Sequence, residues 1–351
     1  MSRFSSLTLC LDMFGCPNRC RHCWLGHGPN GRMEPGDLRF LAEAFRPLAK
    51  QLEVFSWYRE PDYPDNYREL WALEAELSDQ KTPHFENLSV WRAARDPDYV
   101  PWLASLGVQR CQLTFFGGEA MTDRYTGRKG AWADLLETAE RLLAQGIAPR
   151  IQVFVNRETV RELPAVEALI RERDWEKRCE AIGVPFSAFV HQGGCDGANA
   201  QHYPIWVTPA ELPMIPPLLA DYSLRHWKEK SIAAVFGQTE AAICHKLGKN
   251  RRTGKTASDT PTFYIDRNWD VYPNITAPAP WWRLGNLRRD GAAAIADCYR
   301  EERSPAQRAR RTVPLGQMVR AGGDPESQRL FGEGDYCDYL LNKYCEGAVK
   351  E

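Results

Sequence analysis

Short apolar segments alternate with amphipathic segments from residue 6 to residue 190. Segments with the length and composition of strands cover residues 6–11, 52–57, 88–91, 111–115, 151–155 and 186–190. Between them, apolar residues recur every three or four positions, as in helices, over residues 34–48, 66–77, 97–106, 132–145 and 163–173. Because strands that alternate with helices usually pair in parallel, this pattern predicts an α/β fold built from six strand–helix units.

The overall charge and apolar content exclude several classes of partner. Of the 351 residues, 43% are hydrophobic and 26% are charged, and the formal net charge is -1. A chain so close to neutrality has no global field that favours nucleic acid or a membrane surface. Residues 1–12 lack a secretion signal, and no apolar stretch approaches the length that crosses a bilayer. We therefore expect a cytoplasmic protein with neither nucleic-acid nor membrane partners.

Three cysteines follow the first predicted strand within eight residues. Cys16, Cys20 and Cys23 have the spacing C-x3-C-x2-C, in a loop short enough to aim all three sulfurs at one centre. A structural zinc site and an iron–sulfur cube each normally take four protein ligands, so three thiolates leave one position open for a cofactor or substrate. The alternative is a zinc site that His22, His27 or a remote cysteine completes. The eleven cysteines of the chain are too sparse for a disulfide scaffold, which favours reduced thiolates.

The cysteine loop resembles that of the radical S-adenosylmethionine (SAM) superfamily, in which it follows the first strand of a barrel. The resemblance implies a [4Fe–4S] cluster on Cys16, Cys20 and Cys23 whose open iron binds SAM, and reductive cleavage of SAM to a 5′-deoxyadenosyl radical. It also implies a partial (βα)6 barrel over residues 1–205, with the site at the carboxyl ends of the strands. The residue before the last cysteine is commonly aromatic in the family and lies by the adenine, and here it is His22.

The same resemblance implies which carboxylate contacts SAM. In the family, a Gly-Gly-Glu motif ends the second strand and holds the amino group of SAM. Residues 117–119 have this sequence, but they follow the fourth predicted strand. We place the motif instead at residues 58–61, where Glu60 and Pro61 are retained and both glycines are replaced. Glu60 is therefore the expected SAM ligand, and Glu119 the alternative.

Two polar residues at strand ends are further candidates for SAM contacts. Thr114 occupies the position of a family serine and would reach the ribose or carboxylate of SAM, whereas Phe116 replaces a common aspartate. Asn156 follows the fifth strand, where the family often directs a polar side chain at SAM. Ordinary hydrogen bonding at a strand end explains Thr114 and Asn156 equally well. Residues 114–132 further resemble the family's fourth-strand segment at Asp123, Arg124, Gly127, Gly130 and Trp132.

The end of the chain resembles the SPASM or twitch extension of radical SAM proteins. After a connecting segment at 206–235, residues 236–351 contain a cysteine, a predicted hairpin at 262–272 and a Leu-Gly-Asn-Leu sequence at 284–287. The resemblance implies a smaller α+β extension with one or two auxiliary iron–sulfur clusters. Asn274 replaces the cysteine usual after the Tyr-Pro step, so we expect at most one cluster; the alternative is an extension without a cluster. Its possible ligands are Cys244, Cys298, Cys337 and Cys345, whereas Cys10, Cys111 and Cys179 are expected to be packing residues.

These features predict an oxidoreductase that takes hydrogen from an unactivated C–H bond, with an electron donor such as a flavodoxin or ferredoxin. The extension favours peptide modification, as in natural product biosynthesis of the RiPP type. A dehydrogenase or epimerase of a sugar or aminoglycoside is the second candidate, and a non-catalytic metal-binding or electron-transfer protein is the third. The basic stretch 245–255 is expected to be a solvated loop. Its Gly254-Lys255-Thr256 is similar to a phosphate loop, but no strand precedes it and its spacing from Gly248 is one residue too long.

Overall fold

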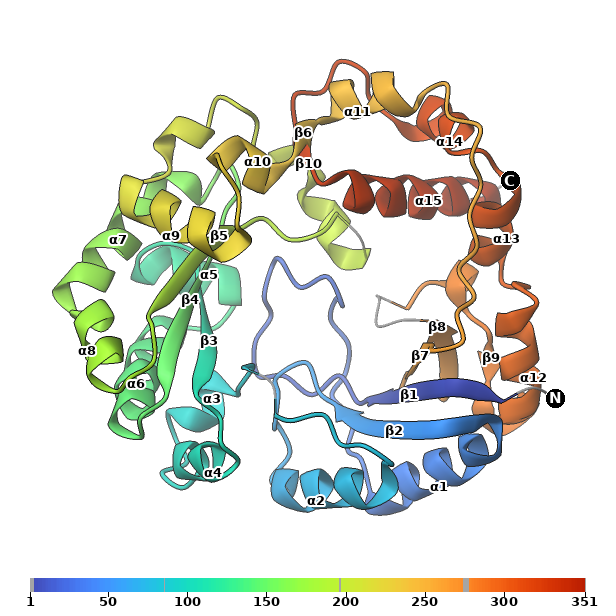
Figure 1. Cartoon of the computed structure of the whole chain (residues 1–351), viewed down its shortest axis with the longest axis horizontal. Helices are drawn as coiled ribbons and strands as arrows, with labels where there is room; N and C mark the ends of the chain where they lie inside the picture. Colours follow the sequence, from blue (N-terminus) through green and yellow to red (C-terminus); the bar gives the residue numbers. More distant parts are fainter. Residues whose placement is uncertain (1–2, 85, 196, 274–277, 351) are drawn as a thin grey trace.

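Two groups of strands stand on opposite sides of the molecule in the computed structural model, which describes residues 3–84, 86–195, 197–273 and 278–350 (Figure 1). The first sheet has the order β2-β1-β7-β8-β9 and the second the order β3-β4-β5. The strands of the first sheet are β1 (Phe4–Asp12), β2 (Ala49–Trp57), β7 (Thr262–Ile265), β8 (Asp270–Pro273) and β9 (Gly285–Asn286). Those of the second are β3 (Arg110–Phe115), β4 (Ala148–Phe154) and β5 (Ser187–His191).

Parallel pairing joins all strands of the second sheet and β2, β1 and β7 of the first, as the alternating pattern predicted, whereas β8 pairs antiparallel with β7 and β9. β1 pairs in parallel with β2 and β7, and β4 pairs in parallel with β3 and β5. The antiparallel hairpin of β7 and β8 confirms the hairpin expected near residues 262–272. Because β7 lies beside β1, a strand from the C-terminal third completes the sheet that starts the chain. The α/β fold with an added C-terminal region is confirmed.

Helices cover the outer faces of the sheets because each has one apolar stripe. In α1 (Pro35–Phe45), the buried residues are Leu38, Leu41, Ala42 and Phe45, and proline at the start fits a first helical turn. α6 (Ala131–Ala144) buries leucines and alanines, and Gly146, with φ of 74°, follows its end as expected. The other helices of this half are α2 (Tyr67–Leu77), α5 (Glu119–Thr126), α7 (Leu163–Glu172), α8 (Trp175–Ala181), α9 (Pro217–Trp227) and α10 (Ile232–Phe236).

The third predicted strand, at residues 88–91, is wrong. Residues 87–89 form no strand, and the short helices α3 (Val90–Ala93) and α4 (Tyr99–Ser105) follow. Ser89 caps α3, since its hydroxyl accepts a hydrogen bond from the Arg92 amide at 3.1 Å, while the Ser89 amide donates to the Tyr99 hydroxyl at 3.1 Å. These side-chain bonds replace the ladder that a strand would need. The wall between β2 and β3 is consequently interrupted.

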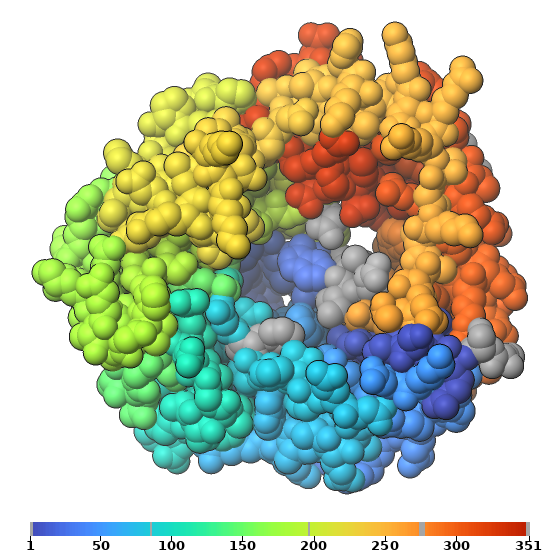
Figure 2. Space-filling view, viewed as in Figure 1, coloured from blue at the N-terminus to red at the C-terminus, as the bar shows by residue number. Residues whose placement is uncertain are grey.

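The C-terminal region is mostly helical and closes the remaining side of the ring of elements in Figure 1. Figure 2 shows the molecule hollowed at its centre. The elements of this region are β6 (Gln238–Thr239), α11 (Glu240–Leu247), α12 (Leu287–Arg300), α13 (Pro305–Thr312), α14 (Leu315–Gly322), β10 (Leu330–Phe331) and α15 (Glu333–Lys350). Single turns of 3-10 helix occur at η1 (Arg46–Leu48), η2 (Val160–Glu162), η4 (Leu212–Met214) and η5 (Pro280–Trp282), with a longer η3 (Gly197–Ile205).

Three large hydrophobic clusters fill the protein. One lies around β3, β4 and β5, a second joins β1, β2, β7 and β8 to α1 and α12, and a third lies among the C-terminal helices. Cys10, Cys111 and Cys179 are buried, as expected of packing residues. Within the described ranges, no helix combines the length and apolar character needed to cross a membrane. The domain boundaries expected near 205 and 235 stay predictions.

Candidate active site

The loop that carries Cys16, Cys20 and Cys23 lies between the two sheets and is fastened on several sides. The amides of Arg19 and Arg21 donate to backbone carbonyls at the end of α5, each at 2.8 Å. On the other side, the Trp24 carbonyl accepts a hydrogen bond from the amide of Ala198 at 2.8 Å. These bonds join the loop to distant parts of the chain, so the tertiary fold fixes its position.

The three cysteine thiols are free and partly exposed, and they lie close enough to influence one another. Burial raises the pKa of Cys16 to about 12, and the negative charge of Glu60 adds to the effect. Burial also raises the pKa of Cys20, and the negative charges of Cys16 and Cys23 raise it further. Arg19 opposes the rise at Cys16 without cancelling it, and bound iron is the kind of partner that would keep all three thiols ionised.

The donor set of this loop fits a four-iron cube. In the described part of the chain, no three Cys, His, Asp or Glu side chains gather closely enough for one metal ion. A cube does not require such a gathering, because each thiolate binds a different iron. Three thiols on one short loop match three corners of a cube and leave the fourth open.

His22 packs against two phenylalanines beside the cysteines. Its ring centroid lies 4.8 Å from that of Phe116 and 4.5 Å from that of Phe154. Desolvation lowers the pKa of His22 to about 3, with His202 and His191 adding to the effect, so the ring is neutral. Its Nδ1 atom is buried and has no hydrogen-bond partner among the described residues. A neutral ring with an unused polar edge fits the place where the family puts an aromatic residue beside adenine.

Glu60 lies at the end of β2 beside the cysteine loop. Its amide donates to the Gly15 carbonyl at 3.1 Å, and its side chain is buried. One carboxylate oxygen accepts hydrogen bonds from the Ser89 hydroxyl at 3.0 Å and the Trp91 amide at 3.2 Å. Burial raises the pKa of Glu60 despite these bonds. Glu119, by contrast, is exposed at the start of α5 and does not line the cavity that Glu60 lines.

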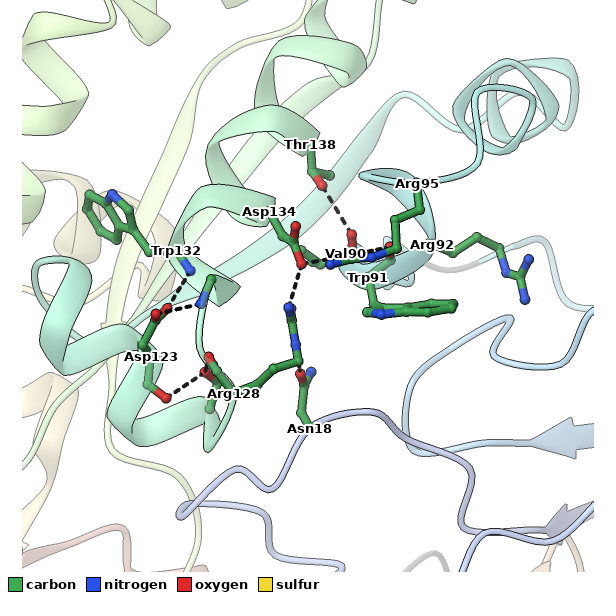
Figure 3. Close-up of polar contacts among 12 residues, drawn as sticks. Asn18, Val90, Trp91, Arg92, Arg95, Asp123, Arg128, Trp132, Asp134 and Thr138 are labelled. Carbon is green, nitrogen blue, oxygen red and sulfur yellow. Dashed lines mark hydrogen bonds and ion pairs between the residues drawn. The ribbon is translucent and has the colours of Figure 1, made fainter.

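Asn18 and Arg128, which the sequence analysis missed, hold Glu60 and the loop together; Figure 3 shows Asn18 beside Arg128. The Asn18 amide nitrogen donates to the second carboxylate oxygen of Glu60 at 3.3 Å, and its oxygen accepts from Arg128 at 2.7 Å. Arg128 in turn pairs with Asp134 at 2.5 Å, and Asp134 also pairs with Arg95 at 2.8 Å. No local pattern could have indicated this network, because Asn18 and Arg128 are 110 positions apart.

Thr114 and Asn156 have different surroundings. The Thr114 hydroxyl donates to Gln152 at 3.1 Å, and the residue lines the cavity described below. The Asn156 side chain is committed to a turn, since its oxygen accepts from the amides of Glu158 at 2.8 Å and Thr159 at 3.0 Å. Its amide nitrogen donates to Tyr125 at 2.9 Å. Thr114 is therefore placed at the cavity and Asn156 behind its wall.

Asp123 has a structural role at the start of α6. Its carboxylate accepts hydrogen bonds from the amides of Gly130 at 2.6 Å and Trp132 at 2.8 Å (Figure 3). These are amides that the beginning of a helix leaves without partners. Asp123 thereby fixes the turn that carries Arg128.

A cavity of about 370 Å³ opens beside the cysteine loop, at the interruption between β2 and β3. Its volume lies within the range of small-molecule sites. It brings together loop, strand-end and turn residues, among them Cys20, His22, Glu60, Thr114, Phe116 and Arg128. The cavity therefore opens where residues 87–89 form no strand, and a ligand can reach the loop there.

A buried ion pair at the base of the loop is hydrogen-bonded to a tyrosine of the C-terminal region. The Asp12 carboxylate pairs with Arg59 at 2.9 Å, and the two side chains are 0% and 4% exposed. Arg59 also donates to the Gly26 carbonyl at 2.6 Å, and the Tyr264 hydroxyl of β7 donates to Asp12. Burial raises the pKa of Asp12, while Arg59 opposes the rise. β7 therefore helps to hold the base of the cysteine loop.

The four cysteines predicted to bind an auxiliary cluster lie in two different hydrophobic clusters. Cys244, Cys337 and Cys345 belong to the cluster of C-terminal helices, whereas Cys298 packs with the cluster of β1 and α12. The Cys244 sulfur lies 3.1 Å from the Tyr336 hydroxyl. Asn274 lies outside the described residues. The four-cysteine set stays a prediction, and it would require Cys298 to leave its present surroundings.

Comparison with known proteins identifies the part of the chain that contains the cavity. Residues 11–170 match the family model of the Radical SAM superfamily. This part of the chain is a radical SAM domain. Cys16, Cys20, Cys23, Glu60, Thr114 and Asn156 all lie within the radical SAM domain, and the four cysteines of the predicted auxiliary site lie outside it. No curated protein sequence matches the chain.

Solved structures of anSMEcpe show the same fold. The structure of native anSMEcpe with bound AdoMet (SAM) and Kp18Cys peptide matches with a TM-score of 0.51 and 14% identity, over 98% of each chain. Native anSMEcpe with bound AdoMet alone gives the same TM-score and identity. SuiB of Streptococcus suis, bound to S-adenosylmethionine, matches with a TM-score of 0.40 and 13% identity, over 85% of this chain and 64% of SuiB. The likeness to anSMEcpe extends beyond the radical SAM domain to the C-terminal region.

Proposed function

We propose that this protein is a radical SAM enzyme that takes a hydrogen atom from a peptide. Cys16, Cys20 and Cys23 hold a [4Fe–4S] cluster, and the adjacent cavity binds SAM. The observation that carries the proposal is the three-thiol loop beside a cavity within a radical SAM domain. With both groups bound, the site supplies a 5′-deoxyadenosyl radical, which takes hydrogen from unactivated C–H bonds.

The residues of the chain bind and orient SAM. Glu60 offers a buried carboxylate to the ammonium group of SAM, a charge-assisted bond that would add a positive charge beside a carboxylate whose pKa burial raises. Thr114 offers a hydroxyl to the ribose or carboxylate. His22 would pack along the adenine. Asn156 supports this wall through Tyr125.

The choice of a peptide substrate rests on the shared fold. The chain resembles anSMEcpe over almost its whole length, and that protein was solved with a bound peptide. The substrate would enter the site near the interrupted wall between β2 and β3. A one-electron donor such as a flavodoxin or ferredoxin, and a cytoplasmic location, complete the proposal.

The decisive experiment uses the anaerobically reconstituted full chain with dithionite and SAM. A tryptic peptide mixture from cells grown in deuterated water is added, and 5′-deoxyadenosine is analysed by mass spectrometry. We expect deuterium in 5′-deoxyadenosine with the peptide mixture and none with a deuterated monosaccharide mixture. Deuterium from the sugars alone would contradict the peptide class, and absence of SAM cleavage in every sample would contradict the enzyme.

A further inference from the structure

Two segments outside the site concentrate positive charge. Residues 246–255 contain five lysines and arginines and no acidic residue, and residues 303–320 contain five arginines, again without an acid. The whole chain, by contrast, contains 45 Lys and Arg and 46 Asp and Glu. We call these ten side chains the basic face: Lys246, Lys249, Arg251, Arg252, Lys255, Arg303, Arg308, Arg310, Arg311 and Arg320.

Backbone hydrogen bonds hold the two segments against each other. The Gly254 amide donates to the Arg310 carbonyl at 2.9 Å, and the Leu315 amide donates to the Arg252 carbonyl at 3.1 Å. Figure 1 shows the coil after α11 running past α14 and then in front of α13. The cations of both segments therefore share one surface.

Close packing at Gly316 fixes the coil in this place. Its amide donates to the Asn250 carbonyl at 2.9 Å. A Cβ atom at Gly316 would lie 2.6 Å from the Gly248 oxygen and 2.8 Å from the Asn250 oxygen, closer than real contacts allow. The stretch expected to be a solvated loop is thus held against α14 by its backbone.

Most of the basic face lacks acidic partners. Nine of its ten residues are exposed, and Arg310 is half-buried. Within the described residues, only Lys246, with Glu333 at 2.5 Å, and Arg303, with Glu301 at 3.2 Å, form ion pairs. Mutual repulsion of the others opposes the fold. A solvated loop would relieve this repulsion by moving away, whereas the backbone bonds and the packing at Gly316 prevent it.

A cationic surface of this kind suits a polyanion. Because the backbone of both segments is already fixed, binding loses less conformational entropy than it would with a flexible loop. Single-stranded nucleic acids also use aromatic platforms for their bases. The exposed large apolar side chains of the described residues are Phe40, Met214 and Trp227, and all three lie outside both segments. We propose that the basic face docks an acidic segment of the peptide substrate, outside the residue that reacts. This inference rests on the proposed function.

The test measures binding of a fluorescein-labelled oligo-glutamate peptide to the full chain by fluorescence anisotropy, without reductant. We expect binding at low salt that weakens as salt increases, since the contacts are exposed ion pairs. The variant R251Q/R252Q/R308Q/R311Q should weaken binding about tenfold or more, because four exposed pairs act together. SAM binding by this variant should stay unchanged.

A matched control variant distinguishes binding by the basic face from a general effect of the net charge of the protein. R39Q/R171Q/K177Q/R289Q removes four exposed cations elsewhere, each paired with an acid, and should change the affinity by less than about twofold. Equal weakening by both variants, or no binding by the native chain at low salt, would overturn the docking surface. Tighter binding of labelled oligothymidine than of oligo-glutamate would assign the face to nucleic acid instead. Because no turnover is needed, these outcomes do not depend on SAM cleavage.

Discussion

The cysteine loop and the C-terminal extension use their thiols differently. Three cysteines of the loop occupy one short segment that is fastened to α5, β2 and residue 198. The four of the extension lie on the separate helices α11, α12 and α15, in two hydrophobic clusters. Close spacing along the chain guarantees proximity of the sulfurs, whereas distant cysteines meet only where helix packing brings them together. The loop therefore presents a donor set that spacing alone could predict, and the extension does not.

Removal of the loop thiols should have the largest effect. We expect the Cys16/Cys20/Cys23→Ala variant to lose SAM cleavage completely, because no other described cysteines share this loop. Its 5′-deoxyadenosine production and iron content are measured after anaerobic reconstitution. Full iron content together with undiminished SAM cleavage would show that the site lies elsewhere.

The next largest effect is expected at the buried pair of Asp12 and Arg59, at the base of the loop. Asp12→Asn leaves the buried Arg59 guanidinium without its counter-charge, and we expect a loss of about 3–5 kcal/mol in the free energy of unfolding. Urea unfolding followed by circular dichroism measures it. The control is Asp65→Asn, since Asp65 is fully exposed and pairs with Arg92 at 3.2 Å. Equal stability of the two variants would mean that the buried ion pair does not stabilise the fold.

Within the radical SAM domain, two glutamates can be compared directly. Glu60→Gln should weaken SAM binding by about 1–3 kcal/mol, the cost of losing a charged hydrogen-bond partner. Glu119→Gln should have little effect, because Glu119 is exposed outside the cavity. Equilibrium dialysis with SAM gives both affinities. The reverse order would restore residues 117–119 as the SAM motif.

The smallest effect is expected in the extension. Cys298→Ala should leave the iron content unchanged, because Cys298 lies in a different hydrophobic cluster from Cys244, Cys337 and Cys345. The measurement is best made in the Cys16/Cys20/Cys23→Ala background, with Cys244→Ala as the comparison. About four remaining irons per chain would support one auxiliary cluster, about eight would need more thiols than the four of the extension, and none would indicate an extension without a cluster. Equal iron loss in both variants would place Cys298 among the ligands.

Most elements of the fold could be predicted because their signals are local. The periodicity of α1 and α6 and the apolar runs of β1 to β5 lie within single segments, and the structure confirms them. The prediction at residues 88–91 was wrong because Ser89 bonds to the start of a helix, and its amide bonds to Tyr99. Apolar content over four residues cannot distinguish these outcomes.

The candidate site divides in the same way. Spacing in the sequence determined the three-thiol loop, because three cysteines within eight residues must lie near one another. Only the tertiary structure decided that Asn18 and Arg128 brace Glu60, that Tyr264 supports Asp12, and that the basic coil lies along α13 and α14. These contacts join residues more than 40 positions apart, and their partners are selected by packing and burial across the whole chain. No short-range pattern carries that information.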